Sequence, residues 1–359
     1  SYGPLADALQ HAANRDPGAA SRKTPTPFLV LRRRPCHAAD SAATLELEIS
    51  LNPMYDLIGD THGYADPLRR LLDQLGYQRK DGVYRHPERK AIFLGDFVDR
   101  GPAIREVLQI VRPMVESGAA LAVMGNHELN LLAFHTEDPE RPGEHLRRRT
   151  PDNTRQVRQT LTQLSAAELS EALDWFRTLP LWLELEGLRV VHACWDEVHL
   201  EQVRRGLEQY GGVTARFLQA AYRQERELFR PVEVILKGKE IALPEGVSFQ
   251  DKDGKVRRRT RTRWYMSPEG MTYRTYALSD AIHCDDPLDP AALRDVAPYP
   301  TTSRPVFVGH YCLSATPPSI LRDNVACLDY GVIKDGPLCG YRWNGEQTLN
   351  NDHLVWVNQ

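Results

Sequence analysis

The chain has 359 residues, a formal net charge of −3, 42% hydrophobic residues and 26% charged residues. This is the composition of a globular protein, and it excludes a disordered or fibrous chain. The small net charge argues against a protein that holds nucleic acid or a membrane surface through a global basic field. No apolar run approaches the roughly 20 residues that a membrane-spanning helix needs.

The six cysteines are scattered along the chain and form no CxxC pair. This pattern favours reduced thiols over a disulfide framework, so we expect a cytoplasmic protein without a membrane partner.

The first 53 residues differ in character from the rest. They mix Ala, Pro, Ser and Arg with little periodicity, and their apolar run at 28–31 is too short for the core of a signal peptide. No methionine precedes Met54, which stands directly before a strong strand pattern. We interpret residues 1–53 as a poorly ordered, non-native leader and residues 54–359 as the folded domain. A targeting or docking segment is the alternative for the leader.

From residue 55 onward, short apolar strands alternate with helices, which predicts an α/β core with a largely parallel sheet. Strands are expected at 55–58, 91–94, 120–124, 189–191, 306–308 and 325–328. Helical periodicity is expected at 68–75, 104–115, 140–180 and 200–230. Residues 232–265 show strand and turn patterns, with Asp253-Gly254 as a hairpin signal.

Polar residues follow these strands where each one ends, beside glycines that allow tight turns. The turns are Gly59-Asp60-Thr61-His62-Gly63, Gly95-Asp96-Phe97-Val98-Asp99-Arg100-Gly101, Gly125-Asn126-His127-Glu128, His192 and Gly309-His310. Ligands of open α/β sheets bind at this edge. A single Asp or Asn at such a turn could be a helix N-cap, but five turns in order predict one site.

The residue types at these turns indicate the chemistry. Two aspartates, one asparagine and three histidines supply oxygen and imidazole ligands without a thiolate, which suits a divalent first-row metal. The set is too large for one ion. Two metals roughly 3.5–4 Å apart with a bridging carboxylate would use all of it, and such pairs catalyse in-line phosphoryl displacement.

The motifs GDTHG, GDFVDRG and GNHE, followed by a strand-terminal His and by GH, resemble the signature of the calcineurin-like metallophosphoesterases. The GDxVDRG and GNHE forms are closest to the phosphoprotein phosphatase branch. That branch includes serine/threonine phosphatases, bacterial diadenosine tetraphosphatases and polynucleotide-phosphatase modules. The resemblance covers about residues 55–345. It implies a four-layer α/β sandwich in which helices flank two mixed β-sheets, with a dinuclear metal site at the carboxyl ends of the strands.

Carried over by position, the resemblance makes Asp60 and His62 ligands of the first metal and Asp96 the bridging carboxylate. Asn126, His192 and His310 would complete the second metal. His127 corresponds to the general acid, Asp99 to the carboxylate that orients it, and Arg100 to the guanidinium that grips phosphate. The implied cofactors are two divalent metal ions, with Mn favoured over Fe or Zn.

The resemblance also implies the reaction, which is hydrolysis of a phosphomonoester by metal-activated water. Its substrate could be a phosphopeptide, a nucleotide or another small phosphoester, with nucleic acid less favoured. The alternatives are symmetrical cleavage of dinucleoside polyphosphates, a phosphatase for nucleic-acid ends, and an inactive phosphate-binding module.

Several features remain open. The long spacing between His192 and His310 predicts an insertion at about 229–290, which carries a basic run at 252–263 that is either a substrate lid or a solvated hairpin. Arg263 and Arg274 are candidates for a second phosphate-binding arginine. Glu128 is either a support of the site or a helix-start acid, and Cys194, where the branch usually has glycine, is expected to be a packed thiol.

Overall fold

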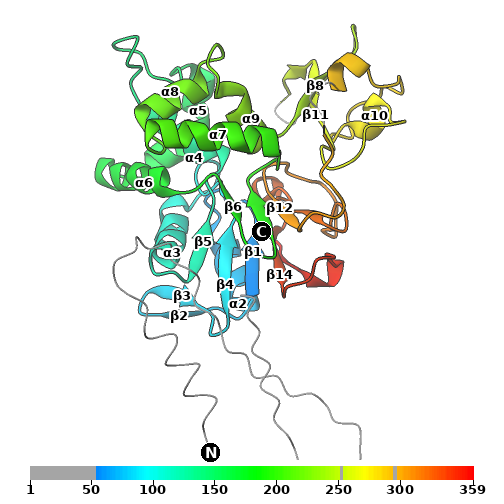
Figure 1. Ribbon diagram of the computed structural model, residues 1–359. Coiled ribbons are helices and arrows are strands. Elements are labelled where there is room, and N and C mark those ends of the chain that lie inside the picture. The colour runs from blue at the N-terminus through cyan, green and yellow to red at the C-terminus, as the bar shows by residue number, and fades with distance from the viewer. Residues whose placement is uncertain (1–53, 251–253, 294–296) are drawn as a thin grey trace, which may run out of the picture. The chain divides into compact units, whose positions relative to one another are not determined.

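The computed structural model describes residues 54–250, 254–293 and 297–359 (Figure 1). The leader interpretation of residues 1–53 therefore lies outside the described residues, as does Asp253 of the predicted turn.

Strands and helices alternate through the first half of the chain, as the sequence pattern predicts. The strands are β1 (Met54–Ile58), β2 (Gln78–Lys80), β3 (Val83–Arg85), β4 (Arg89–Phe93), β5 (Ala120–Ala122), β6 (Trp182–Glu184), β7 (Arg189–Val191), β8 (Glu240–Ala242), β9 (Phe249–Gln250), β10 (Val256–Arg257), β11 (Arg259–Arg261), β12 (Val306–Val308), β13 (Val325–Cys327), β14 (Leu338–Trp343) and β15 (Leu354–Val357). The helices are α2 (Ala65–Gln74), α3 (Ile104–Glu116), α4 (Asn126–His135), α5 (Pro151–Gln163), α6 (Ala166–Thr178), α7 (Glu197–Tyr210), α8 (Ala215–Tyr222), α9 (Phe229–Lys237) and α10 (Tyr273–Tyr276), with short 3₁₀ turns at Pro290–Leu293, Val332–Lys334 and Asn351–His353.

Two mixed sheets form the centre of the domain. The first has the order β15-β14-β1-β4-β5, in which β1, β4 and β5 are parallel and β14 runs antiparallel to β1. The second has the order β13-β12-β7-β6, in which β13, β12 and β7 are parallel and β6 is antiparallel. Helices α2 and α3 pack against the first sheet. The expected mixed α/β fold with two mixed sheets and flanking helices is confirmed.

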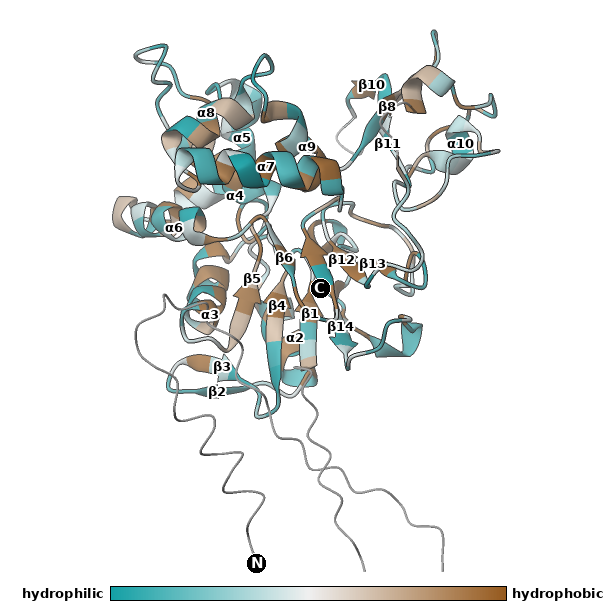
Figure 2. Cartoon of the chain, viewed as in Figure 1, coloured by the Kyte–Doolittle hydropathy of each residue, from teal (hydrophilic) through white to brown (hydrophobic). Residues whose placement is uncertain are grey.

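Alternate residues of the strands face different cores, as the period of two in a strand requires. Leu57 and Ile92 of the first sheet share one buried cluster with Val190 and Phe307 of the second, which is the core between the sheets. Ile58 and Phe93 belong to the other large cluster, together with residues of the flanking helices. Figure 2 shows β5 and β12 in brown. All of β12 is buried, and β5 is buried except for the half-buried Leu121.

Helix α5 begins where the chain supplies a cap. Thr150 accepts a hydrogen bond from the Asn153 backbone N–H, and Pro151 occupies the first helical position, where its missing N–H costs nothing. The predicted helical region 140–180 was therefore wrong at its start, because residues 140–150 form turns and loops before the cap.

The prediction of strands from residue 232 was also wrong. Residues 229–237 form α9, whose apolar side chains Val232, Val234, Ile235 and Leu236 are buried. Beyond it, β8 pairs with β11 and β9 pairs with β10, both antiparallel. Residues 241–288 contain a small cluster of their own, which includes Ile241 and Tyr276. The insertion at about 229–290 stays a prediction.

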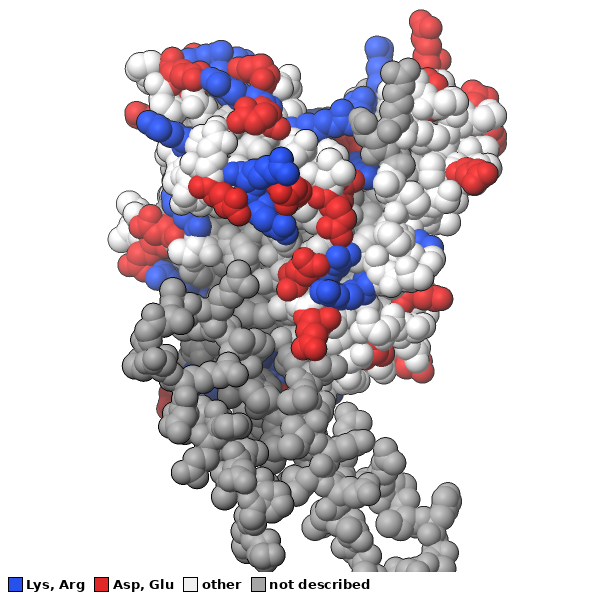
Figure 3. Space-filling model, in the orientation of Figure 1, with Lys and Arg blue, Asp and Glu red and all other residues white. Residues whose placement is uncertain are grey.

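Acidic and basic side chains interleave over α7 on the face shown in Figure 3. Arg204 and Arg205, for example, both pair with Glu201. Within the described ranges, no helix is long and apolar enough to cross a membrane.

Candidate metal centre

Both sheets contribute to one group of polar side chains at their strand ends. The loops after β1 and β4, together with the start of α4 after β5, supply the residues from Asp60 to His127, and the loops after β7 and β12 supply His192 and His310. The sheets meet here directly, because the His192 Nδ1–H donates to the Leu94 carbonyl oxygen at 2.7 Å.

The backbone at these turns is strained. His62, Asp96, Asp99, Arg100 and His310 all have positive φ values, between 43° and 69°. Residues other than glycine adopt this region rarely and at a cost of about 1–3 kcal/mol each, and such residues cluster at functional sites. The folded structure supports this strain at five of the nine predicted site residues, which is evidence for a functional centre.

Two glycines allow the backbone to approach the carboxylates closely. A Cβ on Gly125 would lie 2.2 Å from Asp96 Oδ1, and a Cβ on Gly309 would lie 2.0 Å from Asp60 Oδ1. No side chain larger than hydrogen fits at either position unless the carboxylate moves. These glycines therefore fix the placement of both aspartates.

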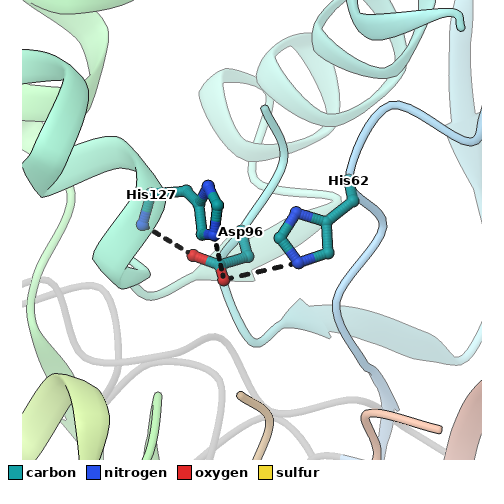
Figure 4. Close-up of side chains that lie close together, drawn as sticks. All are labelled: His62, Asp96 and His127. Carbon is teal, nitrogen blue, oxygen red and sulfur yellow. Dashed lines mark hydrogen bonds and ion pairs between the residues drawn. The ribbon is translucent and has the colours of Figure 1, made fainter. Parts of the chain in front are cut away.

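Asp96 lies at the centre of the group (Figure 4). Its Oδ2 lies 3.6 Å from His62 Nε2, 3.9 Å from His127 Nε2 and 3.4 Å from His192 Nε2. Its Oδ1 accepts the His127 backbone N–H at 2.9 Å. Burial alone would raise the pKa of Asp96, but the imidazoles, His192 foremost, hold it well below its ordinary value.

Two histidines present the nitrogen that a metal needs. The Nδ1 of His62 lies 3.1 Å from the Val98 carbonyl oxygen, and that of His192 bonds the Leu94 carbonyl oxygen. A carbonyl oxygen can only accept, so each Nδ1 carries a hydrogen, and each Nε2, the nitrogen left for a metal, faces Asp96. Hydrogen bonds of this kind fix the tautomer of metal-binding histidines.

The remaining predicted ligands surround this pair. Asn126 Oδ1 lies 3.2 Å from His192 Nε2 and 2.6 Å from His310 Nδ1. Asp60 Oδ2 accepts the His310 backbone N–H at 3.0 Å. The structure thus brings all six predicted metal ligands into one group, in which five are buried and His310 is half-buried.

The donor set fits a pair of divalent metals. Among the described residues, the ligand atoms of His62, Asp96 and His127 lie within 4.8 Å of one another, and so do those of Asp96, His192 and His310. The two groups share Asp96, as a bridging carboxylate would require. Asp60 Oδ1 and His310 Nε2 are buried without a hydrogen-bond partner, and each could be satisfied by one of the two metal ions.

His127 belongs to a second hydrogen-bonded chain. Its Nδ1 lies 2.7 Å from Asp99 Oδ2, and Thr160 donates to Asp99 Oδ1 at 2.6 Å and accepts the Asp99 backbone N–H at 3.0 Å. Burial lowers the pKa of His127, but Asp96 and Asp99 outweigh it and leave that pKa above its ordinary value. The amide nitrogen of Gln156 lies 3.3 Å from the same Nδ1.

Glu128 is both the acid at the start of α4 and a support of the site. Its carboxylate accepts the Gly125 N–H at the start of α4 and the N–H groups of Asp96 and Phe97 at 2.8 and 2.7 Å. It therefore ties the loop after β4 to the helix that carries His127. Burial, with Asp96 second, raises the pKa of Glu128 to about 7.

The arginines lie differently. Arg100 is exposed beside the group of metal ligands. Its positive charge adds to burial in opposing the rise of the His127 pKa that Asp96 and Asp99 cause. Arg274 pairs with Asp285 in an exposed ion pair, and Arg263 donates to the Ala277 carbonyl oxygen. Arg261, which belongs to the basic run at 252–263, adds its charge to burial in lowering the pKa of the His310 imidazole. Cys194 is fully buried, as expected for a packed thiol.

Thr160 and Gln156 were missed by sequence reasoning. Both lie on α5, about thirty residues beyond the motif that carries His127, in a stretch with no distinguishing pattern. Asp329 lies just after β13, within the region 55–345 that the resemblance covers, and its Oδ2 accepts the Cys312 N–H. Burial, and after it the charge of Asp329, raise the pKa of Asp60.

A mixed α/β fold with buried Asp, His and Asn side chains at its strand ends defines a candidate metal-dependent hydrolase. The chain belongs to the calcineurin-like phosphoesterase family, whose profile matches residues 55–272.

Curated relatives share part of this region. A bis(5′-nucleosyl)-tetraphosphatase PrpE (asymmetrical) of Halalkalibacterium halodurans is 47% identical over 74 residues, which cover 20% of this chain and 30% of that protein. The enzyme of the same name from Oceanobacillus iheyensis is 30% identical over 169 residues, 45% of this chain and 66% of that protein. A symmetrical bis(5′-nucleosyl)-tetraphosphatase of Thioalkalivibrio sulfidiphilus is 34% identical over 165 residues, 42% of this chain and 52% of that protein. The chain thus spans less than two thirds of the length of each.

A solved cold-active protein tyrosine phosphatase aligns with a TM-score of 0.46 and 17% identity, over 86% of this chain and 80% of that one.

Proposed function

We propose that this protein hydrolyses phosphoester or phosphoanhydride bonds at a dinuclear metal centre. The observation that carries the proposal is that two clusters of ligand atoms, one of His62, Asp96 and His127 and one of Asp96, His192 and His310, share Asp96. We assign His127 of the first cluster to proton transfer, because its ring bonds Asp99. Asp60 and His62 would hold the first ion with Asp96, and Asn126, His192 and His310 would hold the second. The mixed oxygen and imidazole donors suit Mn, with Fe or Zn as alternatives. When bound, the ions would supply an activated water and a clamp on the phosphoryl oxygens.

The side chains outside the ligand set suit protonation of the leaving group and binding of the phosphate. His127 would donate a proton to the leaving oxygen, because Asp99 orients its ring and favours its protonated form. Arg100 is exposed at the edge of the centre, where its planar fork could hold two phosphate oxygens. A module that only binds phosphate would need no such acid, and this argues for an enzyme.

Dinucleoside polyphosphates are the substrate class that we favour. The curated relatives described above are named as bis(5′-nucleosyl)-tetraphosphatases, and they include both asymmetrical and symmetrical enzymes. Their names support a nucleotide substrate for this chain but not one position of cleavage.

Product analysis tests this proposal. Mn-loaded protein would be incubated with diadenosine tetraphosphate, p-nitrophenyl phosphate, a phosphothreonine peptide and a 3′-phosphorylated oligonucleotide. Symmetrical cleavage of the tetraphosphate gives two ADP, whereas asymmetrical cleavage gives ATP and AMP. We expect one of these patterns at a higher kcat/KM than any monoester shows, and no turnover by Asp96→Asn. Two bound metals without turnover of any compound would contradict an enzymatic function.

The second candidate substrate is a phosphomonoester. Its most specific form would be the phosphorylated end of a nucleic acid. The observation in favour of the latter is the group of arginines at 257–263, of which Arg261 lies close enough to act on His310. Selective turnover of the oligonucleotide, with binding that weakens steeply as salt rises, would support it.

A further inference from the structure

A hollow lies outside the metal centre, since none of the predicted metal ligands lines it. It has a volume of about 470 Å³ and lies between the segment that leads into α5 and the end of α8. This volume is within the range of small-molecule sites, which run from about 300 to 1,000 Å³. Four arginines line it (Arg141, Arg147, Arg148 and Arg223), together with three carboxylates (Asp138, Glu144 and Glu225).

Two of these arginines already have acidic partners. Arg141 lies 3.9 Å from Glu144, and Arg223 pairs with Asp138. For Arg147 and Arg148, no carboxylate of the described ranges lies within ion-pair distance. The hollow therefore contains two guanidinium groups without acidic partners.

Arg147 is the more unusual of the two, because it is half-buried. Its Nη2 donates to two neutral oxygens, Asn153 Oδ1 at 3.1 Å and Gln156 Oε1 at 2.6 Å. Its Nη1 is buried without a hydrogen-bond partner. Burial disfavours the charge of this guanidinium, which no carboxylate of the described residues contacts, and an anion in the hollow would offset that cost.

The hollow is linked to the proposed acid by a short chain of contacts. Arg147 holds Gln156, whose amide nitrogen lies 3.3 Å from His127 Nδ1. On the other wall, the Tyr222 hydroxyl donates to Asn130 Oδ1 on α4, the helix that begins with Asn126 and His127. A ligand in the hollow would thus lie within a few side chains of the metal centre.

We propose that this hollow is a phosphate subsite, distinct from the metal centre, in which Arg147 and Arg148 hold a phosphate group of a nucleotide or polyphosphate. The planar forks of the arginines match phosphate oxygens. In its assignment of the phosphate to a nucleotide, the inference rests on the proposed function. The group comes either from the far end of a bound dinucleoside polyphosphate or from a separate nucleotide.

Direct binding tests the subsite. The full-length protein would be stripped of metal with a chelator, and ADP would be titrated into it by calorimetry, so that neither turnover nor metal-held phosphate contributes. We expect ADP to bind and Arg147→Gln to weaken binding by about tenfold or more, the worth of a charge-assisted contact. Arg112→Gln on α3, whose guanidinium pairs with Glu116, is the matched control and should bind as the wild type does.

Absence of ADP binding to the wild type, or equal binding by the Arg147 and Arg112 variants, would overturn the proposal. If circular dichroism shows that Arg147→Gln is unfolded, Arg148→Gln decides in its place, because Arg148 is exposed. This test does not require the enzyme to be active, so it fails or succeeds independently of the proposed function.

The metal-loaded enzyme separates the two sources of phosphate. If the hollow holds the far end of the substrate, Arg147→Gln should raise the KM for diadenosine tetraphosphate about tenfold more than the KM for p-nitrophenyl phosphate, which has no second phosphate. If it holds a separate nucleotide, ADP should change the kcat for p-nitrophenyl phosphate in the wild type and lose that effect in the variant.

Discussion

Thr160 offers the sharpest test of how the centre holds its acid. It is completely buried, and its hydroxyl makes two hydrogen bonds to Asp99, the carboxylate that bonds His127. In Thr160→Val, the side chain keeps its shape and loses only the hydroxyl. The perturbation is therefore confined to the support of the acid.

The magnitude follows from what is left unpaired. A hydrogen bond to a charged group is worth about 1.5–3 kcal/mol, and an orphaned buried N–H costs about 1–3 kcal/mol. Because both contributions come from one hydroxyl and are not additive, we expect the free energy of unfolding to fall by about 2–4 kcal/mol. A positioned acid contributes about 10²–10⁴-fold to the rate, and partial loss of its orientation should lower kcat by about tenfold.

The assay is a double-mutant cycle on kcat, together with chemical denaturation. Thr160→Val should lower kcat in the wild type and have no effect on kcat in a His127→Asn background, because it acts only through that ring. Thr162→Val, on the same helix but exposed, removes a hydroxyl that bonds only the Gln159 carbonyl oxygen and should change neither measurement. The same loss of kcat in both backgrounds, or equal effects of both valines, would refute the reasoning.

Three further perturbations test other parts of the site. His127→Asn should keep the metal content, measured by elemental analysis, and lower turnover by about 10²–10⁴-fold; unchanged turnover would remove His127 from the role of acid. Gly309→Ala places a Cβ 2.0 Å from Asp60 Oδ1 and should reduce metal occupancy. Full occupancy would show that the loop relaxes at little cost. Asp196 has a lowered pKa, because its bonds to His199 and Lys239 outweigh the effect of burial. The ionised Asp196 carboxylate should therefore stabilise the folded state fully above its ordinary pKa of about 3.9, and this stabilisation should be lost as the pH falls from there toward its lowered pKa. The difference in Tm between wild type and Asp196→Asn should accordingly shrink in acid. A difference that stays constant with pH would contradict that assignment.

The motifs predicted the parts of the site that lie next to the strands. Asp60, Asp96, Asn126, His192 and His310 each follow a strand within a few residues, so strand order and the rule that ligands bind at strand ends were sufficient to place them together. The local pattern could not show that Asp96 and His310 take up positive φ values, which only the packed structure maintains.

The rest of the site depends on packing between distant segments. Thr160 and Gln156 reach the centre because α5 lies against the loop after β4, and no spacing in the sequence encodes that contact. Arg147 belongs to a conspicuous run of three arginines, but only the structure shows that its guanidinium is buried next to neutral partners. Residues 232–237 were mistaken for a strand because a short apolar run fits either a strand or a buried helix.

The central claim is that two metal ions share Asp96. Its most direct test is the metal stoichiometry of the purified protein under Mn saturation, measured by elemental analysis on wild type and on Asp96→Asn. We expect two ions per chain in the wild type and loss of occupancy at both positions in the variant. One ion in the wild type, or two ions retained by Asp96→Asn, would contradict the shared carboxylate.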